Sequence, residues 1–176
     1  FFDGAGRGHL LNRLTAPITG TAADTAYALY ADEGFNTYTF SMPVLVDTGD
    51  AAAIQAAKPV TVTGPVTIWG DMALSGGALT LNRNPDGGMN DKITKLHGDL
   101  RGNGNARIGL DEFSVWQGAA LQEGELDLMM RNSVWENSTG KASAQGSRVK
   151  TLKGSDNALI RQKDDKPLMI DRFSGS

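Results

Sequence analysis

The chain has 176 residues, with 17 basic against 20 acidic side chains and a formal net charge of −3, so it lacks the basic excess of a nucleic-acid-binding protein. Apolar residues make up 40%, but none of their runs approaches the roughly 18 residues that a membrane-spanning helix needs. Cysteine is absent, which excludes disulfides, thiolate zinc sites and a cysteine nucleophile.

Glycine, at 22 residues against 6 prolines, favours many short strands joined by tight turns. The first four residues, Phe1-Phe2-Asp3-Gly4, lack the charged start and apolar core of a signal peptide. If the protein is secreted, we therefore expect its signal to have been removed or to lie outside this sequence.

The mixed pattern of residues 1–59 predicts an irregular N-terminal segment with short helical or strand elements. Residues 25–31 fit either a helical turn or a strand, and residues 38–46 alternate like a strand that Pro43 interrupts. Residues 50–58 predict a short helix, with Asp50 as its N-cap and Pro59 as its stop.

From residue 60 to residue 176 the pattern becomes repetitive. Short apolar or β-branched runs alternate with clusters of Gly, Asn, Asp and Ser, which predicts strands of about four to six residues bounded by turns. Asn132, Asn137 and Asn157 are expected in such turns. The predicted strands are residues 60–63, 66–69, 78–81, 93–96, 106–110, 114–116, 125–130, 149–152, 158–160 and 168–173.

The spacing of the apolar positions indicates the architecture. A loose period of about 20 relates Leu81 to Leu100, Ile108 to Leu128, Leu128 to Leu152, and Leu152 to Ile170. Such a period predicts the coils of a right-handed parallel β-helix, an all-β solenoid. An antiparallel sandwich is the alternative, but it predicts frequent hairpin dipeptides, and Asp86-Gly87 is the one clean candidate.

Three segments resemble a known family. Residues 130–137 (MRNSVWEN) resemble the "N-[ST]-x-W" rung of autotransporter passengers, residues 148–152 (RVKTL) resemble the strand that follows, and residues 167–176 (PLMIDRFSGS) resemble a strand near the end of pertactin-like passengers. The segment between residues 135 and 149 is longer than that family pattern, and such passengers usually continue further. The resemblance therefore implies a fragment of a longer protein.

The resemblance implies a β-helical stem whose C-terminal part is an autochaperone, a region that folds first and supports secretion across the outer membrane. It implies a bacterial cell-surface location, and as partners the protein's own C-terminal outer-membrane β-barrel and a host surface protein or glycan. Nucleic acid is not an expected partner. The residues expected to carry the structural and folding role are Trp135, Asn132, Val149, Leu152, Leu168 and Ile170.

Catalytic motifs are missing, so we predict no enzyme activity, no cofactor and no metal. His9 and His97 have no metal-ligand spacing, and neither a G-x-S-x-G nor a G-D-S-G motif occurs. Gly4-x-Gly6-x-Gly8 follows no strand and is interpreted as a flexible terminus rather than a phosphate loop.

Two acidic pairs leave another function open. Asp111-Glu112 and Asp164-Asp165 fit the carboxylates of a carbohydrate-active β-helix or a phage tailspike, although Asp164-Asp165 lies between lysines, as solvated loops often do. A structural module of β-sandwich type is the third hypothesis.

Overall fold

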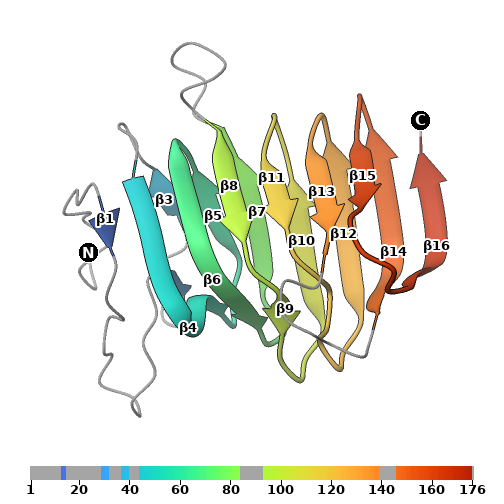
Figure 1. The fold of residues 1–176 in the computed structure, drawn as a ribbon, viewed down its shortest axis with the longest axis horizontal. Helices are drawn as coiled ribbons and strands as arrows, with labels where there is room; N and C mark the ends of the chain where they lie inside the picture. Colours follow the sequence, from blue (N-terminus) through green and yellow to red (C-terminus); the bar gives the residue numbers. More distant parts are fainter. Residues whose placement is uncertain are drawn as a thin grey trace.

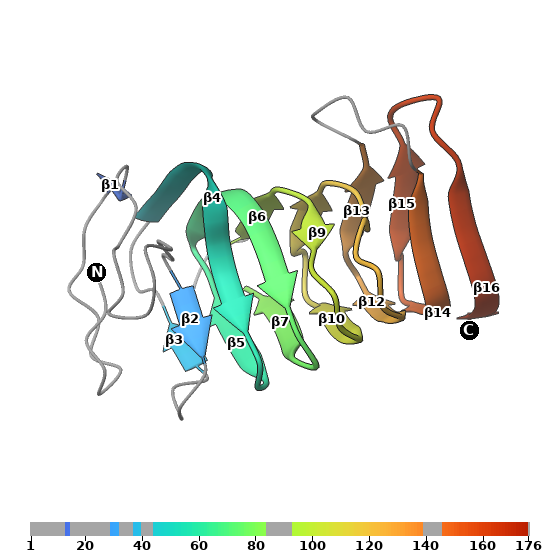
Figure 2. The same ribbon diagram turned by 90° about the horizontal axis from the view of Figure 1, so that it is seen from below.

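The chain forms a parallel β-solenoid (Figure 1, Figure 2). The computed structural model describes residues 13–14, 29–31, 37–39, 44–83, 93–138 and 146–175, and every regular element in these residues is a β-strand. In Figure 1 the near strands run down and the far strands run up as the chain advances from left to right, which is a right-handed winding. The predicted β-helix is thus confirmed.

Two parallel sheets make up the solenoid, and most turns contribute a strand to each. The nine-stranded sheet contains β1 (Arg13–Leu14), β4 (Val44–Ala56), β6 (Val66–Leu74), β8 (Thr94–His97), β11 (Val115–Gln117), β13 (Val134–Asn137) and β15 (Leu159–Gln162), with β2 (Leu29–Ala31) beside β4 and β9 (Leu100–Arg101) beside β6. The seven-stranded sheet contains β3 (Thr37–Thr39), β5 (Val60–Thr63), β7 (Ala78–Asn82), β10 (Ala106–Leu110), β12 (Leu126–Arg131), β14 (Ser147–Ser155) and β16 (Leu168–Gly175).

The core lies between the two sheets. Successive side chains of a strand point to opposite faces, so in β12 Leu126, Leu128 and Met130 are buried while Met129 is 60% exposed on the outside. Burying one such side chain contributes about 1.5–3 kcal/mol. Columns of these side chains run from coil to coil and hold the coils together.

Two of the four spacings that indicate the period join residues that are true register partners. Ile108 pairs with Leu128, and Leu128 pairs in turn with Leu152. The second interval is longer than the first, so the length of a coil varies while the strand register is kept. The additional residues lie between Trp135 and Leu152, a stretch that includes residues 139–145, which lie outside the described residues.

The other two spacings join residues that are not register partners. Leu81 pairs with Leu110 rather than Leu100, because this coil also includes residues 84–92, which lie outside the described residues together with the hairpin candidate Asp86-Gly87. Ile170 pairs with Val149, and Phe173 is the partner of Leu152. The inward alternation of β14 skips one position between Val149 and Leu152, which the sequence periodicity could not show.

The helix predicted over residues 50–58 is wrong. Residues 50–56 belong to β4, where Ile54 pairs with Met72, and Ala53, Ile54 and Ala56 are buried. The helix propensity of alanine exceeds that of other ordinary residues by only up to about 0.7 kcal/mol, so the burial of Ile54 between two coils outweighs it.

The structure describes only part of the short elements predicted before residue 50. Residues 29–31 form β2, which selects the strand over the helical turn, and residues 37–39 form β3. Residues 40–43 lie outside the described residues, as do the other residues of the predicted N-terminal elements before residue 44.

Turns between the strands use left-handed backbone conformations. Asn132 has a φ of 47° and Asn157 a φ of 49°, as expected for asparagines at corners, and Glu112 and Phe113 also have positive φ. In the described part of the chain, no helix has the length and apolarity needed to cross a membrane.

Candidate functional site

Two stacked indoles lie inside the solenoid. Trp116 of β11 and Trp135 of β13 are register partners, both are fully buried, and their ring centroids are 4.9 Å apart with an interplanar angle of 6°. Each Nε1–H donates a 2.9 Å hydrogen bond to a carbonyl one coil earlier, Trp116 to Gly98 and Trp135 to Gly118. Packing and hydrogen bonding therefore tie three consecutive coils together at this position.

Glycines form the corner beside the indoles. In three successive coils a glycine follows an outward-facing residue: Gly70 follows Trp69, Gly98 follows His97 and Gly118 follows Gln117. These outward-facing residues are register partners of one another. A Cβ on Gly118 would overlap the carbonyl oxygen of Gly98 and approach Nε1 of Trp116 to 2.9 Å, and a Cβ on Gly98 would overlap the carbonyl of Gly70. Only glycine lets successive coils approach this closely. The recurrence of glycine at this position was a signal that our sequence analysis missed.

Two carboxylates, the partly exposed Asp71 and the buried Asp99, accept hydrogen bonds from backbone groups next to these glycines. Asp71 Oδ1 accepts the N–H of Asp99 at 2.9 Å, and Asp99 Oδ1 accepts the N–H of Ala119 at 2.9 Å. Arg101 donates to both carboxylates, at 2.9 Å to Asp71 and 2.8 Å to Asp99. The charge of Asp99, which is 5% exposed, is therefore paired and hydrogen-bonded, as a buried charge needs to be.

A neutral network continues this role in the following coils. Ser147 Oγ accepts the N–H of Ala120 at 2.9 Å and donates to Asn137 Oδ1, and Asn137 Nδ2 donates to Gln162 Oε1 at 2.7 Å. Asn137 was expected in a turn, but it is the last residue of β13 and is buried. The network connects β13, β14 and β15.

The C-terminal end of the described solenoid is apolar. Ile160, Leu168 and Ile170 pack against the core but are only partly buried, and Phe173, which follows Leu152 in the inward column, is 69% exposed. A hollow of about 370 Å³ lies beside Phe173 and Leu152. β15 and β16 are the last strands of their sheets, so within the described residues one edge of each strand has no partner strand.

A polar row runs along the outside of the nine-stranded sheet. His97 stacks on Trp69, with centroids 4.0 Å apart, and its Nδ1 lies 2.7 Å from Gln117 Oε1. Glu136 follows Gln117 in register and accepts a 3.1 Å hydrogen bond from Arg161. Partial burial lowers the pKa of His97, although the hydrogen bond with Gln117 raises it, so the ring is neutral at neutral pH.

The two acidic pairs lie in different surroundings. Asp111 accepts two hydrogen bonds from Arg131, at 2.6 and 2.8 Å, and Glu112 lies 3.1 Å from the same guanidinium. Asp164 accepts a turn N–H at 3.0 Å, and the side chain of Asp165 is 92% exposed. In the described ranges no group of three or more His, Asp or Glu residues could hold a metal ion.

The predicted folding residues occupy two neighbouring coils. Trp135, Val149 and Leu152 are buried in the core, and Asn132 forms the corner before β13. Leu168 and Ile170 line the apolar C-terminal end. His9 and the glycines at positions 4, 6 and 8 lie outside the described residues.

Three comparisons with known proteins gave no match to this chain. No protein-family model matches the chain, and neither curated proteins nor solved structures include a significant match to it.

Proposed function

We propose that this chain is a non-catalytic stem segment of a secreted bacterial passenger of the autotransporter type. In this proposal it reaches the cell surface through the periplasm and outer membrane, with its own C-terminal β-barrel, outside this sequence, as its secretion partner. The stem presents an adhesin or virulence effector to a host surface protein or glycan. The solenoid fold supports a stem role, because stacked coils make a long, rigid body in which each coil contacts only its neighbours.

The stack of Trp116 and Trp135 carries the folding part of the proposal. These indoles and their hydrogen bonds to Gly98 and Gly118 join three coils in the C-terminal half of the chain. The network around Asn137 extends the connection to β15. These contacts favour a C-terminal nucleus on which the preceding coils are added one at a time.

Such a nucleus suits secretion without an external energy source. Once the last coils have formed, the free edges of β11 and β12 can pair with β8 and β10 of the coil before. Each added coil contributes its own buried side chains and strand hydrogen bonds. Folding outside the cell then needs no ATP.

Matched core substitutions test this order of folding. Leu152 of β14 and Leu81 of β7 are both buried leucines of the seven-stranded sheet. Leu152→Ala and Leu81→Ala should each lower the free energy of unfolding by about 2–5 kcal/mol. Leu152→Ala should mainly slow refolding, whereas Leu81→Ala should mainly speed unfolding, as stopped-flow folding kinetics can measure.

The reverse assignment would remove the C-terminal nucleus from the proposal. If Leu81→Ala slows refolding and Leu152→Ala affects only unfolding, the chain nucleates from its N-terminal side. Equal effects on refolding would likewise contradict a nucleus confined to the C-terminal coils.

A further inference from the structure

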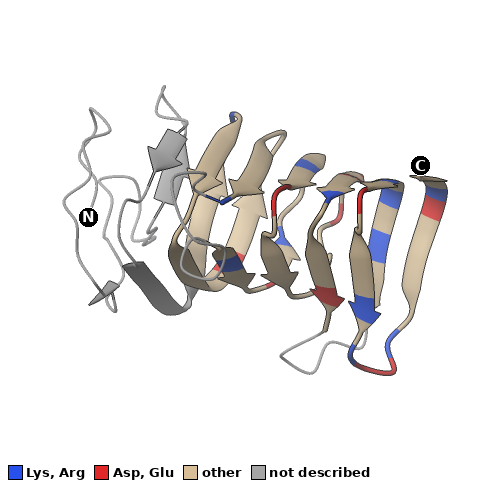
Figure 3. Ribbon diagram, turned by 90° about the horizontal axis from the view of Figure 1, so that it is seen from above, with Lys and Arg blue, Asp and Glu red and all other residues tan. Residues whose placement is uncertain are grey.

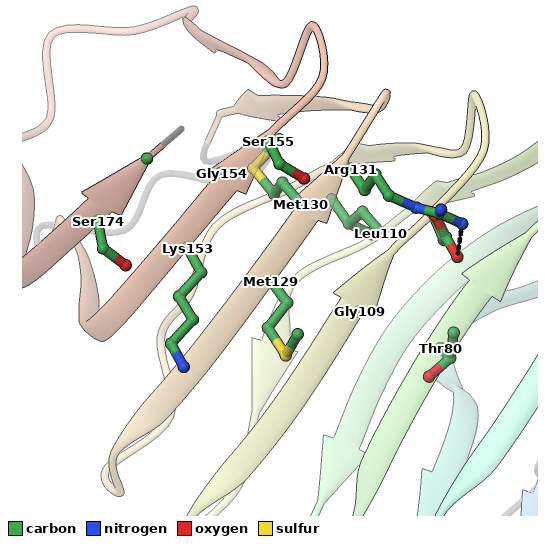
Figure 4. Close-up of a pocket in the computed structure, with 12 residues that line it drawn as sticks. Thr80, Gly109, Leu110, Met129, Met130, Arg131, Lys153, Gly154, Ser155 and Ser174 are labelled. Atoms are coloured by element: carbon green, nitrogen blue, oxygen red, sulfur yellow. Dashed lines mark hydrogen bonds and ion pairs between the residues drawn. The ribbon is translucent and has the colours of Figure 1, made fainter.

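A groove crosses the outer face of the seven-stranded sheet (Figure 4). Its central row comes from successive strands in register: Thr80, Gly109, Met129, Lys153 and Ser174. The groove encloses about 540 Å³ on the side of Asp111 and Arg131, and a second hollow of about 450 Å³ continues it on the side of Arg107 and Asp127. The whole surface is open to solvent.

Gly109 keeps the middle of this groove open. It lies between Thr80 and Met129 in the row, and a Cβ at this position would come within 3.3 Å of Thr80 Oγ1. Any larger side chain would project outward into the groove. Met129, which is 60% exposed, provides an apolar wall beside it.

Three basic side chains of this face are exposed and lack an ion pair within the described residues. They are Arg107, Lys153 and Arg172. A second register row, beside the central one, contains Arg107, Asp127, Thr151 and Arg172, and Asp127 is its one carboxylate. Asp111 forms an ion pair with Arg131. Figure 3 shows Lys and Arg positions along β14 and β16 at this end of the solenoid, with an acidic position beside them on β16, where Asp171 lies 3.4 Å from Arg148. The groove lining holds Arg107, Arg131 and Lys153 against Asp111 and Asp127, an excess of one positive charge, although the chain as a whole has a net charge of −3.

The direction of the groove limits its occupant. Neighbouring strands lie about 4.8 Å apart, so the row from Thr80 to Ser174 extends about 19 Å across five strands. The backbone groups of the inner strands are used by the parallel ladders, so the groove offers side chains rather than a strand edge for an extended peptide. Hydroxyls, a thioether and ammonium or guanidinium groups at regular intervals suit a ligand with repeating polar and carboxylate groups.

We propose that this groove binds a linear polysaccharide that carries carboxylate groups. Lys153 and Arg107 pair with carboxylates, Thr80 and Ser174 hydrogen-bond to sugar hydroxyls, and Met129 packs against the apolar face of a sugar ring. The proposal rests on the part of the proposed function that names a host glycan as a partner, and it assigns the contact with that glycan to the stem itself. It makes no use of the folding nucleus.

Binding of the 176-residue chain to hyaluronan, measured by calorimetry at low salt with neutral dextran and poly-glutamate as comparison ligands, tests the proposal. Lys153→Gln should weaken hyaluronan binding about tenfold, because it removes one charge-assisted contact. Gly109→Val should weaken binding by filling the groove without changing its charge. Lys95→Gln removes a lysine that is also exposed but belongs to the other sheet, at β8, and should leave binding unchanged.

The proposal is supported if hyaluronan binds, dextran and poly-glutamate bind much more weakly, and the first two variants alone lose affinity. It is overturned if hyaluronan does not bind, if poly-glutamate binds equally well, or if Lys95→Gln has the same effect as Lys153→Gln. Each of these failures would leave the refolding result for Leu152 and Leu81 unaffected, so the groove and the folding nucleus can be judged separately.

Discussion

Trp135→Ala is expected to lower the free energy of unfolding by about 3–5 kcal/mol. The indole is fully buried, stacks on Trp116 and donates its N–H to Gly118, so the substitution leaves a cavity and a carbonyl without its donor. Urea denaturation followed by circular dichroism measures this loss. In the full-length protein the variant should reduce display at the cell surface more than synthesis.

Two other substitutions separate the contributions of the hydrogen bond and of burial to this loss of stability. Trp135→Phe keeps an aromatic ring in the stack but removes the N–H donor. It should therefore lower the free energy of unfolding by closer to roughly 1–3 kcal/mol, the cost of an unsatisfied buried group. Trp69→Ala changes a tryptophan that is 48% exposed on the outer face and should cost less than Trp135→Ala. An unchanged unfolding midpoint and protease resistance for Trp135→Ala would show that the stack does not stabilise the stem.

Gly118→Ala should be destabilising by about 3 kcal/mol, at the upper end of overpacking effects. The added methyl group would overlap a backbone carbonyl of the preceding coil, and backbone cannot move aside as a flexible side chain can. The coils would have to separate at a corner where Trp135 also donates its hydrogen bond. Thermal and urea unfolding of the variant measure the effect.

Gly154→Ala is the matched control for this prediction. A Cβ at Gly154 would make an ordinary contact of 3.5 Å with Ala158, and its backbone does not have positive φ. The substitution should be neutral or stabilise by about 0.4–1 kcal/mol, because it restricts the unfolded chain. If Gly118→Ala is as well tolerated as Gly154→Ala, the close approach of the coils is not a requirement of the fold.

Strand positions from residue 60 onward could be predicted because they depend on local alternation and turn residues. The runs at residues 60–63 and 106–110 match β5 and β10, and the paired positions Ile108 and Leu128 follow from the period. These features need no knowledge of which coil lies next to which. Asn132 and Asn157 were likewise predictable as corner residues, because asparagine tolerates positive φ.

Contacts between coils could not be predicted in the same way. The stack of Trp116 on Trp135 depends on the length of the coil that joins them, and the neighbouring coils differ from it in length. The outer groove depends on Gly109, Met129 and Lys153 being brought into one row from three strands. The strand at residues 50–56 was mistaken for a helix because its alanines are selected by the core rather than by local propensity.

The order in which coils form is the central claim of this account, and pulse-labelling hydrogen exchange during refolding of the 176-residue chain tests it most directly. Mass spectrometry would follow backbone protection in peptides from each coil after refolding times from milliseconds to seconds. We predict that residues 115–138 and 146–155 become protected before residues 60–83, because the stacked indoles and the Asn137 network form the nucleus. Protection that develops first in residues 60–83, or at one common rate along the chain, would contradict the claim.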